Sequence, residues 1–522
     1  MNYLNTNAPA IHFQKTRNNE IYVDKSLLID RLNALIDTGK CYVCVTRPRR
    51  FGKTINANML GAYYTKELQS EELFSELEIT KRKSYKQHLN QHNVIYIDFS
   101  RMPDFCESYK EYIVNIIDMI KEDLVQAYPT LGEKKYSMLS KMFQDTQDSF
   151  IFILDEWDSI FYKEFMAKKD KDAYLEFLKG LLKDQPYVEL AYMTGVLPIA
   201  KYSSGSELNM FEEYNFMNDN VYDSYFGFSE EEVKMLCKRF DTVPYEELKR
   251  WYDGYYTSEG NSLFNPRSVS NALSNGLCRN YWTETGPMNE VADCVEHNVD
   301  EVREDIVKLV SGISVPIKLK GYSAAEQQLN SRNEILSAMV VYGFLSYYDG
   351  FIKIPNYELM EKFEEVMSRK SMGTVRDIVQ QSKEMLSATL EGNAERVAQI
   401  LEEVHDREIP FLKYHDENSL SCVITLCYLC ARDEYWMERE YATGKGYCDY
   451  IFIPKKLSNP AIILELKYNR SAQEALQQIK DKDYIQKVKH CKEVLLVGIN
   501  YDEEKYHSCM IEKVNCHVTP IE

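Results

Sequence analysis

The turn at residues 47–54, RPRRFGKT, carries residue types that bind phosphate. A glycine at position 52 lets the backbone approach a ligand closely, Lys53 could reach the β- and γ-phosphates of a nucleotide, and Thr54 could ligate Mg²⁺. The usual pattern, G-x-x-x-x-G-K-[ST], has a glycine where this chain has arginine, so a chance GKT at an ordinary helix start is the alternative. The turn predicts an ATP site formed by Arg47, Pro48, Arg49, Arg50, Phe51, Gly52, Lys53 and Thr54.

A second motif, FILDE, strengthens this interpretation. Residues 150–156 read as an almost wholly apolar strand that ends in two acids. Asp155 stands where the Mg²⁺-holding aspartate of a P-loop ATPase belongs, and Glu156 stands where a water-activating glutamate belongs. The alternative is a strand end that carries two surface carboxylates.

Four further residues are weaker candidates for the same site. Thr194, just past the strand VELAYM, is placed like a polar sensor of the γ-phosphate, although a capping threonine would look the same. Asp24 and Lys25 precede the loop and are candidates to face the adenine. Arg267 could reach phosphate from a helical lid or could be an ordinary surface arginine.

Near the C-terminus, a second group of residues could bind metal. Glu465 and Lys467 are two apart on a predicted strand, so they share one face, and a hairpin would bring Asp449 beside them. Two carboxylates can hold Mg²⁺, and the lysine can polarise a water for phosphodiester attack. Glu417 could add a carboxylate, and Gln478 could hold water or phosphate. The alternative is an edge hairpin with solvated charges.

The elements around these residues alternate between strands and helices. Continuously apolar strands are buried on both faces, as in a parallel sheet covered by helices. We expect such strands at 41–46, 94–100, 150–158 and 188–195. The later chain reads as helices with an Asp-Gly hairpin turn, and then as a second α/β region with strands at 447–453, 461–468 and 493–500. The predicted domains are a P-loop α/β domain at 1–228, a helical lid and winged-helix-like region at 229–400, and a nuclease-like α/β domain at 401–522.

Composition limits the possible partners. The 522-residue chain has a formal net charge of −19, so nucleic acid binding would require a local basic groove or bound metal. We find neither a signal peptide nor a run of 18 apolar residues, and we expect a cytoplasmic protein without membrane contact. The 13 cysteines are then free thiols, and the C-x-x-C pairs at 41/44 and 427/430 read as small buried apolar residues.

Taken together, these motifs resemble a bacterial family of predicted AAA-ATPase-like proteins. YVDK, RPRRFGKT and LDE recur there in this order, with an arginine in place of the first glycine of the loop, and a PD-(D/E)XK nuclease-superfamily domain follows. WYDGYY and NPRSV resemble the family's lid, and MTGVLPIAK resembles its sensor strand. In the C-terminal part, the residues that match the D…E-x-K pattern, the helix glutamate and the A-L-x-Q-I glutamine are Asp449, Glu465, Lys467, Glu417 and Gln478.

The resemblance implies an AAA-like P-loop domain joined to a restriction-endonuclease-like fold, with Mg²⁺-dependent cleavage of DNA or RNA. Two hypotheses follow. In the first, ATP hydrolysis acts as a switch that governs a nuclease, in defence or mobile-element control. In the second, the chain is a sensor or scaffold that holds ATP with little turnover and whose C-terminal domain recognises nucleic acid without cutting it. A homo-oligomer is compatible with both.

Overall fold

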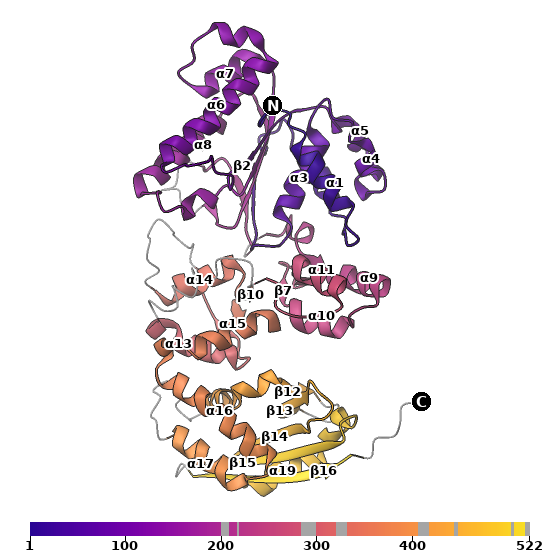
Figure 1. Cartoon of the computed structure of the whole chain (residues 1–522), viewed down its shortest axis with the longest axis vertical. Coiled ribbons are helices and arrows are strands. Elements are labelled where there is room, and N and C mark those ends of the chain that lie inside the picture. The colour runs from indigo at the N-terminus through magenta and orange to yellow at the C-terminus, as the bar shows by residue number, and fades with distance from the viewer. Residues whose placement is uncertain are drawn as a thin grey trace. The chain divides into compact units, whose positions relative to one another are not determined.

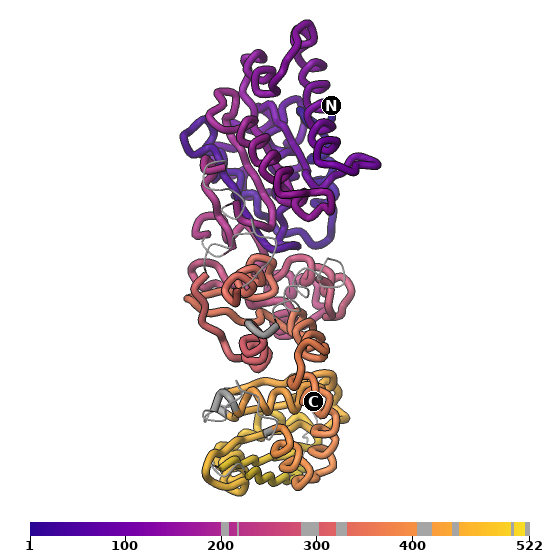
Figure 2. The backbone as a smooth tube through the Cα atoms, turned by 90° about the vertical axis from the view of Figure 1, so that its left-hand side faces the viewer, coloured from indigo at the N-terminus to yellow at the C-terminus, as the bar shows by residue number. Residues whose placement is uncertain are grey.

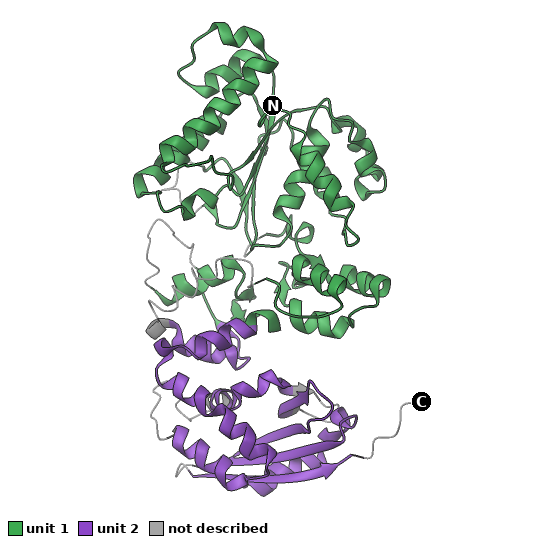
Figure 3. Cartoon of the chain, viewed as in Figure 1, with its two compact units in different colours: residues 1–294, 316–359 green, residues 295–315, 360–522 purple. Residues whose placement is uncertain are grey.

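The computed structural model describes residues 1–199, 208–216, 219–282, 299–319, 331–405, 417–442, 447–502 and 506–516. They form two compact units (Figure 3), the first made of residues 1–294 with 316–359 and the second of residues 295–315 with 360–522. The domain boundaries after residues 228 and 400 stay predictions.

The first unit is built on a five-stranded parallel sheet in the order β2-β3-β4-β1-β5. Its strands are β1 (Tyr42–Thr46), β2 (Asn93–Asp98), β3 (Phe150–Asp155), β4 (Val188–Gly195) and β5 (Glu212–Tyr214). Every residue of β3 is buried, because helices cover both faces of the sheet. The parallel sheet expected from the sequence is therefore confirmed. The short polar strand β5 was not predicted, since EEY lacks an apolar run.

Helices form a layer on each side of this sheet (Figure 1). One layer contains α6 (Tyr109–Ala127), α7 (Leu139–Thr146) and α8 (Lys168–Leu182). The other contains α1 (Ala8–Arg17), α3 (Lys53–Tyr64), α4 (Glu71–Phe74) and α5 (Tyr85–His88), and α2 (Leu27–Asn33) packs into the same core. Alternate residues of β3 point to opposite faces of the sheet. Phe152 and Leu154 pack in the core with α6, α7 and α8, and Ile151 and Ile153 pack in the core with α1, α2 and α3.

A helical region follows the sheet within the same unit. It consists of β6 (Phe228–Ser229), α9 (Glu230–Phe240), α10 (Tyr245–Tyr252), β7 (Tyr255–Tyr256), β8 (Ser262–Phe264), α11 (Pro266–Asn275), α14 (Arg332–Tyr342), β10 (Ser346–Tyr348) and β11 (Phe351–Lys353). Strands β10 and β11 form an antiparallel hairpin whose turn residues, Asp349 and Gly350, both have positive φ. The predicted Asp-Gly hairpin is therefore confirmed, because this turn needs residues that tolerate that conformation. The winged-helix assignment stays a prediction.

The second unit contains a mixed sheet in the order β12-β13-β14-β15-β16. The strands are β12 (Tyr435–Ala442), β13 (Tyr447–Pro454), β14 (Ala461–Tyr468), β15 (Glu493–Tyr501) and β16 (His507–Asn515). Only β14 and β15 run parallel. The sequence predicted the three central strands but not β12 or β16. The edge strand β16 alternates in exposure, so it lacks the continuous apolar run of a central strand.

This sheet is yellow in Figure 2. The helices of the unit are α13 (Val299–Val310), α15 (Tyr357–Met367), which begins in the first unit, α16 (Thr374–Leu390), α17 (Ala394–His405), α18 (Glu417–Cys427) and α19 (Ala472–Asp481). Among them, α17 packs against β16, and α19 packs against β14, β15 and β16. Leu476 and Ile479 of α19 share a core with Ile463 of β14, which brings this helix over the strand that carries Glu465. No helix in the described part of the chain has the length and apolar character to cross a bilayer.

Candidate functional site

The turn between β1 and α3 has the backbone of a phosphate-binding loop. Gly52 caps α3 with a φ of 92°, in the left-handed region that favours glycine. Arg50 also has a positive φ, of 73°. The turn leads into a 12-residue helix, whose first amides have no partner within the helix and point toward the space where an anion would lie.

Lys53 is buried beneath this turn, with an exposed fraction of 4%. Its ammonium donates hydrogen bonds to the carbonyl oxygens of Arg47, at 3.1 Å, and Pro48, at 3.0 Å. Burial lowers the pKa of Lys53, whereas the nearby carboxylates of Glu156, Asp158 and Asp155 raise it. The structure therefore holds a cation inside the loop, with only neutral carbonyls as hydrogen-bond partners.

Asp155 meets the loop because β4 lies between β1 and β3, so the carboxyl ends of all three strands share one edge. The pKa of Asp155 is raised to about 7, mainly by burial and also by Glu156 and Asp98, against the lowering effect of a hydrogen bond from Thr54. Asp155 Oδ2 is buried and accepts no hydrogen bond from the described residues. A hydroxyl beside an unpartnered carboxylate oxygen suits a Mg²⁺ site that water and phosphate would complete.

Glu156 stands at the end of β3 with strained backbone, at a φ of 52°. Its amide donates to Asp155 Oδ1 at 3.1 Å. Non-glycine residues in this conformation cost free energy and cluster at functional sites. Its carboxylate raises the pKa of Arg50, which burial and the neighbouring cations Arg267 and Arg49 lower. Arg267 of α11 therefore lies near the loop, and its contact with phosphate stays a prediction.

Two acids of this edge were missed. Asp98 ends β2 and pairs in register with Asp155, which the two parallel VIYID and FIFILD strands could have indicated. Asp158 is buried and accepts hydrogen bonds from the amides of Val196, at 3.2 Å, and Leu197, at 2.9 Å. A Cβ on Gly195 would lie 2.4 Å from Asp158 Oδ1, so only glycine fits there. The spacing of the acids in LDEWD is the signal for Asp158.

Arg47 does not direct its guanidinium toward the phosphate position. It is ion-paired with Asp219 and donates to the carbonyl oxygens of Thr46, at 2.8 Å, and Tyr214, at 3.1 Å. Its exposed fraction is 2%. The side chain anchors the loop, so only its backbone is left to meet a nucleotide. This corrects the prediction for its side chain.

Other loop residues contact the surrounding protein. Phe51 packs its ring at 5.0 Å from that of Tyr255 in β7. Pro48 lies against Gly343, where a Cβ would come within 2.6 Å of the proline ring. Arg49 lies with its guanidinium 5.8 Å from the ring of Tyr162. These contacts fix the loop from outside.

The candidates for adenine contact hold backbone segments in place. Lys25 Nζ lies 2.7 Å from Glu232 and 3.0 Å from the carbonyl oxygen of Ser224. Asp24 accepts hydrogen bonds from the amides of Ser26 and Glu78, both at 2.7 Å. Both side chains therefore have structural partners, and contact with adenine stays a prediction.

Thr194 lies within β4, beside Val45 of β1, and β4 spans the residues 188–195 that were predicted for it. Thr194 is fully buried, and its hydroxyl has no partner that satisfies hydrogen-bond geometry among the described residues. Its role as a phosphate sensor stays a prediction.

The C-terminal residues gather on the face of the second sheet that α19 covers. Lys467 Nζ lies 3.0 Å from Glu465 Oε1, and Gln478 of α19 donates a hydrogen bond to the same oxygen. Asp449 Oδ2 accepts a hydrogen bond of 2.7 Å from the amide of Leu466 on the neighbouring strand. The structure thus brings together Asp449, Glu465 and Lys467, as their spacing and a hairpin suggested, and it adds Gln478 from α19.

Glu465 is the buried acid of this group, with an exposed fraction of 2%. Its pKa is raised to about 7, mainly by burial and also by Asp449, against the lowering effect of Lys467. Its Oε2 atom is buried and accepts no hydrogen bond from the described residues. An unpartnered carboxylate oxygen beside a second carboxylate fits a divalent cation. In the described part of the chain no three His, Cys, Asp or Glu side chains form a metal cluster, so water and substrate would supply the other ligands.

Tyr484 and Glu417 are two further residues considered for this centre. Tyr484 is buried, and its pKa is raised by burial and by Glu465. A side-chain hydrogen bond with Gln478 has the opposite, smaller effect on this pKa. Sequence reasoning missed this tyrosine, whose only signal is its place shortly after the glutamine helix. Glu417 is the first residue of α18, but its side chain lies outside the described residues.

Metal affinity at this centre is expected to rise with pH. Because the pKa of Glu465 is about 7, a divalent cation must displace a proton below that pH and meets no such competition above it. The affinity for Mn²⁺ should therefore increase about fivefold between about pH 6 and pH 7 and level off above about pH 8. Calorimetric titration of Mn²⁺ at several pH values measures this rise, and Glu465→Gln should remove it. A wild-type affinity that stays flat with pH would contradict the assignment.

Comparison with known families agrees with this geometry. Residues 11–204 match the family model described as predicted AAA-ATPase, and residues 415–510 match that of the PD-(D/E)XK nuclease superfamily. The chain therefore carries an AAA-ATPase-like domain followed by a domain of the PD-(D/E)XK nuclease superfamily, and the resemblance noted in the sequence is confirmed.

Two solved structures are similar to part of the chain. The Walker-type ATPase PABY2304 of Pyrococcus abyssi is 14% identical with a TM-score of 0.33, and the match covers 67% of this chain and 97% of that chain. The ORC2 protein of Aeropyrum pernix, in ADPNP–ADP complexes, is 11% identical with a TM-score of 0.31 and the same two coverages. No curated protein matches the chain. Both TM-scores are low, so the assignment depends on the family matches.

Proposed function

We propose that the first unit binds ATP with Mg²⁺ and hydrolyses it. The observation that supports this most directly is that Lys53, Thr54 and Asp155 meet at one edge of the sheet, with Glu156 beside them. A buried ammonium and free helix amides complement a triphosphate. The unpartnered Asp155 oxygen and the Thr54 hydroxyl complement its metal ion.

Separate residues of the chain would bind the phosphates, hold the metal ion and activate the attacking water. The amides of the turn and Lys53 would hold the phosphates, and Lys53 would exchange its two carbonyl partners for phosphate oxygens. Thr54 and Asp155 would hold Mg²⁺, which when bound neutralises phosphate charge. Glu156 would orient the attacking water and accept its proton.

For the second unit we propose Mg²⁺-dependent cleavage of DNA or RNA. Asp449 and Glu465 would hold the metal ion, which polarises the phosphodiester when bound. Lys467 would orient the attacking water, and Gln478 would keep Glu465 in place through its hydrogen bond. ATP hydrolysis would govern this activity, in a setting of defence or mobile-element control.

A specific observation favours a second candidate, an ATP-holding sensor with little turnover. Arg47 replaces the usual glycine, and its buried pair with Asp219 fixes the loop to the segment that precedes the lid. A loop tied in this way suits a protein that reports nucleotide occupancy to the lid. Under this alternative the C-terminal domain recognises nucleic acid without cutting it.

Replacing Glu156 with glutamine separates these candidates. If the protein is an ATPase, Glu156→Gln should lower the turnover number roughly 100- to 1000-fold while ATP still binds, because the amide cannot accept the proton of the attacking water. Phosphate release and nucleotide binding measured on the same preparations test this.

The matched control is Glu164→Gln, which makes the same change at an exposed residue of the same unit. It should retain wild-type turnover. Wild-type protein that binds ATP but releases no phosphate, with or without nucleic acid, would favour the sensor.

A further inference from the structure

A cavity in the first unit borders Arg47, the first residue of the 47–54 turn. Its volume is about 250 Å³, which approaches the size of small-molecule sites. It lies between the segment after β5, the loop that joins β7 to β8 and the β10–β11 turn. Among its described lining residues, none comes from positions 48–54.

The lining carries excess negative charge. Its charged residues are three aspartates and one arginine. Arg47 neutralises Asp219, whereas the hydrogen bonds that Asp223 accepts from described residues come from neutral Ser258 groups, the amide at 3.1 Å and the hydroxyl at 3.2 Å. Asp349 adds a second carboxylate. Two unneutralised carboxylates would repel a phosphate group and attract a cation.

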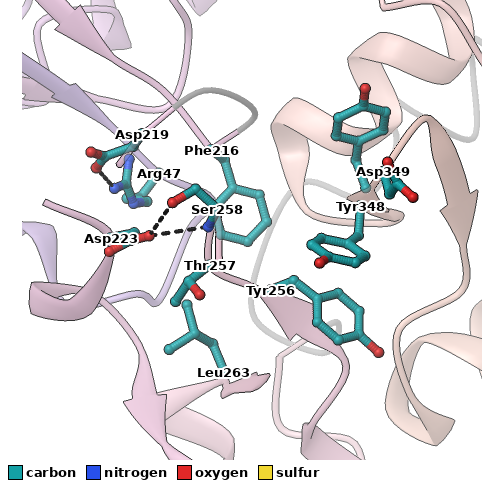
Figure 4. Close-up of a pocket in the computed structure, with 11 residues that line it drawn as sticks. Arg47, Phe216, Asp219, Asp223, Tyr256, Thr257, Ser258, Leu263, Tyr348 and Asp349 are labelled. Carbon is teal, nitrogen blue, oxygen red and sulfur yellow. Dashed lines mark hydrogen bonds and ion pairs between the residues drawn. The ribbon is translucent and has the colours of Figure 1, made fainter. Parts of the chain in front are cut away.

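Aromatic rings supply the rest of the wall. Figure 4 shows Asp223 and Ser258 on one side and Tyr348 and Asp349 on the other, with Phe216 and Tyr256 between them. The rings of Tyr256 and Tyr348 have centroids 5.4 Å apart. Ring faces attract cations, most strongly where water is displaced.

Two cations already use this chemistry at the border of the cavity. The guanidinium of Arg47 lies 4.9 Å from the ring of Phe226 while it pairs with Asp219. The ammonium of Lys353 lies 4.6 Å from the ring of Tyr256. The cavity lining has the same two kinds of group, with the carboxylates of Asp223 and Asp349 and the rings of Phe216 and Tyr348.

We propose that this cavity binds a small organic cation, a compound with a protonated amine or guanidinium group. The charge would lie between Asp223 and Asp349, and the carbon skeleton would lie against Phe216, Tyr256 and Tyr348. A bound cation would join the segment after β5 to the β10–β11 turn. Since the Asp219–Arg47 pair forms part of the wall, the ligand would also contact the segment that anchors the phosphate-binding loop.

Calorimetric titration of the full chain with agmatine, which carries a guanidinium and an ammonium, tests the proposal. Asp223→Asn and Asp349→Asn should each weaken binding about tenfold, because each removes one charge-assisted contact. Asparagine suits position 349, where φ is 48°. The control Asp118→Asn removes an exposed carboxylate of α6 and should bind agmatine as the wild type does.

An uncharged ligand, a second variant and a competition experiment with ATP complete the test. The uncharged 1,5-pentanediol should not bind. If melting curves show that an aspartate variant does not fold, Tyr348→Leu, at a side chain 45% exposed, serves as the second variant and should also weaken binding. The proposal is wrong if wild-type protein does not bind agmatine at millimolar concentration, or if folded variants bind it unchanged. It is also wrong if ATP displaces agmatine, because the cavity would then belong to the nucleotide site.

Discussion

Lys53→Ala is expected to weaken ATP binding roughly 100-fold and to abolish phosphate release. This effect should be larger than that of Glu156→Gln, which is expected to leave ATP binding intact. The ammonium is the one cation buried under the turn in the described chain, and its present partners are neutral carbonyl oxygens. Without it, the phosphates would lose their closest positive charge. Equilibrium binding of a fluorescent ATP analogue, together with phosphate release, measures both losses.

The fold of this variant should survive. Burial lowers the pKa of Lys53, which means that the charged form costs free energy in the protein without nucleotide. Removing the charge is therefore not expected to lower the melting temperature substantially. Lys15→Ala, at an exposed position of α1, is the matched control and should bind ATP normally. Wild-type ATP affinity in the Lys53 variant would exclude the turn as the phosphate site.

Asp449→Ala should reduce divalent-ion-dependent cleavage of DNA or RNA roughly 1000-fold, because one of two metal-holding carboxylates is lost. The remaining acid, Glu465, would hold the metal ion alone and would still be paired with Lys467. Cleavage of labelled DNA and RNA, titrated with Mg²⁺, Mn²⁺ and ATP, measures the loss and shows whether the nucleotide governs the activity.

A change of the same kind outside the centre provides the control. Asp481 is exposed at the end of α19, where it accepts a hydrogen bond from Gln477. Asp481→Ala should leave cleavage unchanged. Cleavage that persists in Asp449→Ala would point to a contaminating nuclease or to a different centre in the chain.

Several features of the fold could be predicted because local signals were sufficient. Apolar runs such as FIFILD indicated buried parallel strands, since a strand covered on both faces has no polar face to alternate with. The residues GKT and LDE indicated the two halves of a nucleotide site. Strands β5, β12 and β16 were not predicted, because they are defined by pairing with a neighbouring strand and not by a continuous apolar run.

The spacing of residues in the sequence could not predict contacts between distant segments. Arg47 was expected at the phosphates, but Asp219, far along the chain, takes its guanidinium. Such outcomes depend on which charges and strands become neighbours when the chain folds.

The sequence by itself determined the residue types of both centres and the periodicity that places Glu465 and Lys467 on one face. The tertiary structure alone decided that Asp155 lies beside Thr54, that Asp98 and Asp158 surround the same edge, and that Gln478 reaches Glu465. The physical reason is that periodicity and turn chemistry act over a few residues. Burial, ion pairing and pKa instead depend on strand order and on the helix that covers each face.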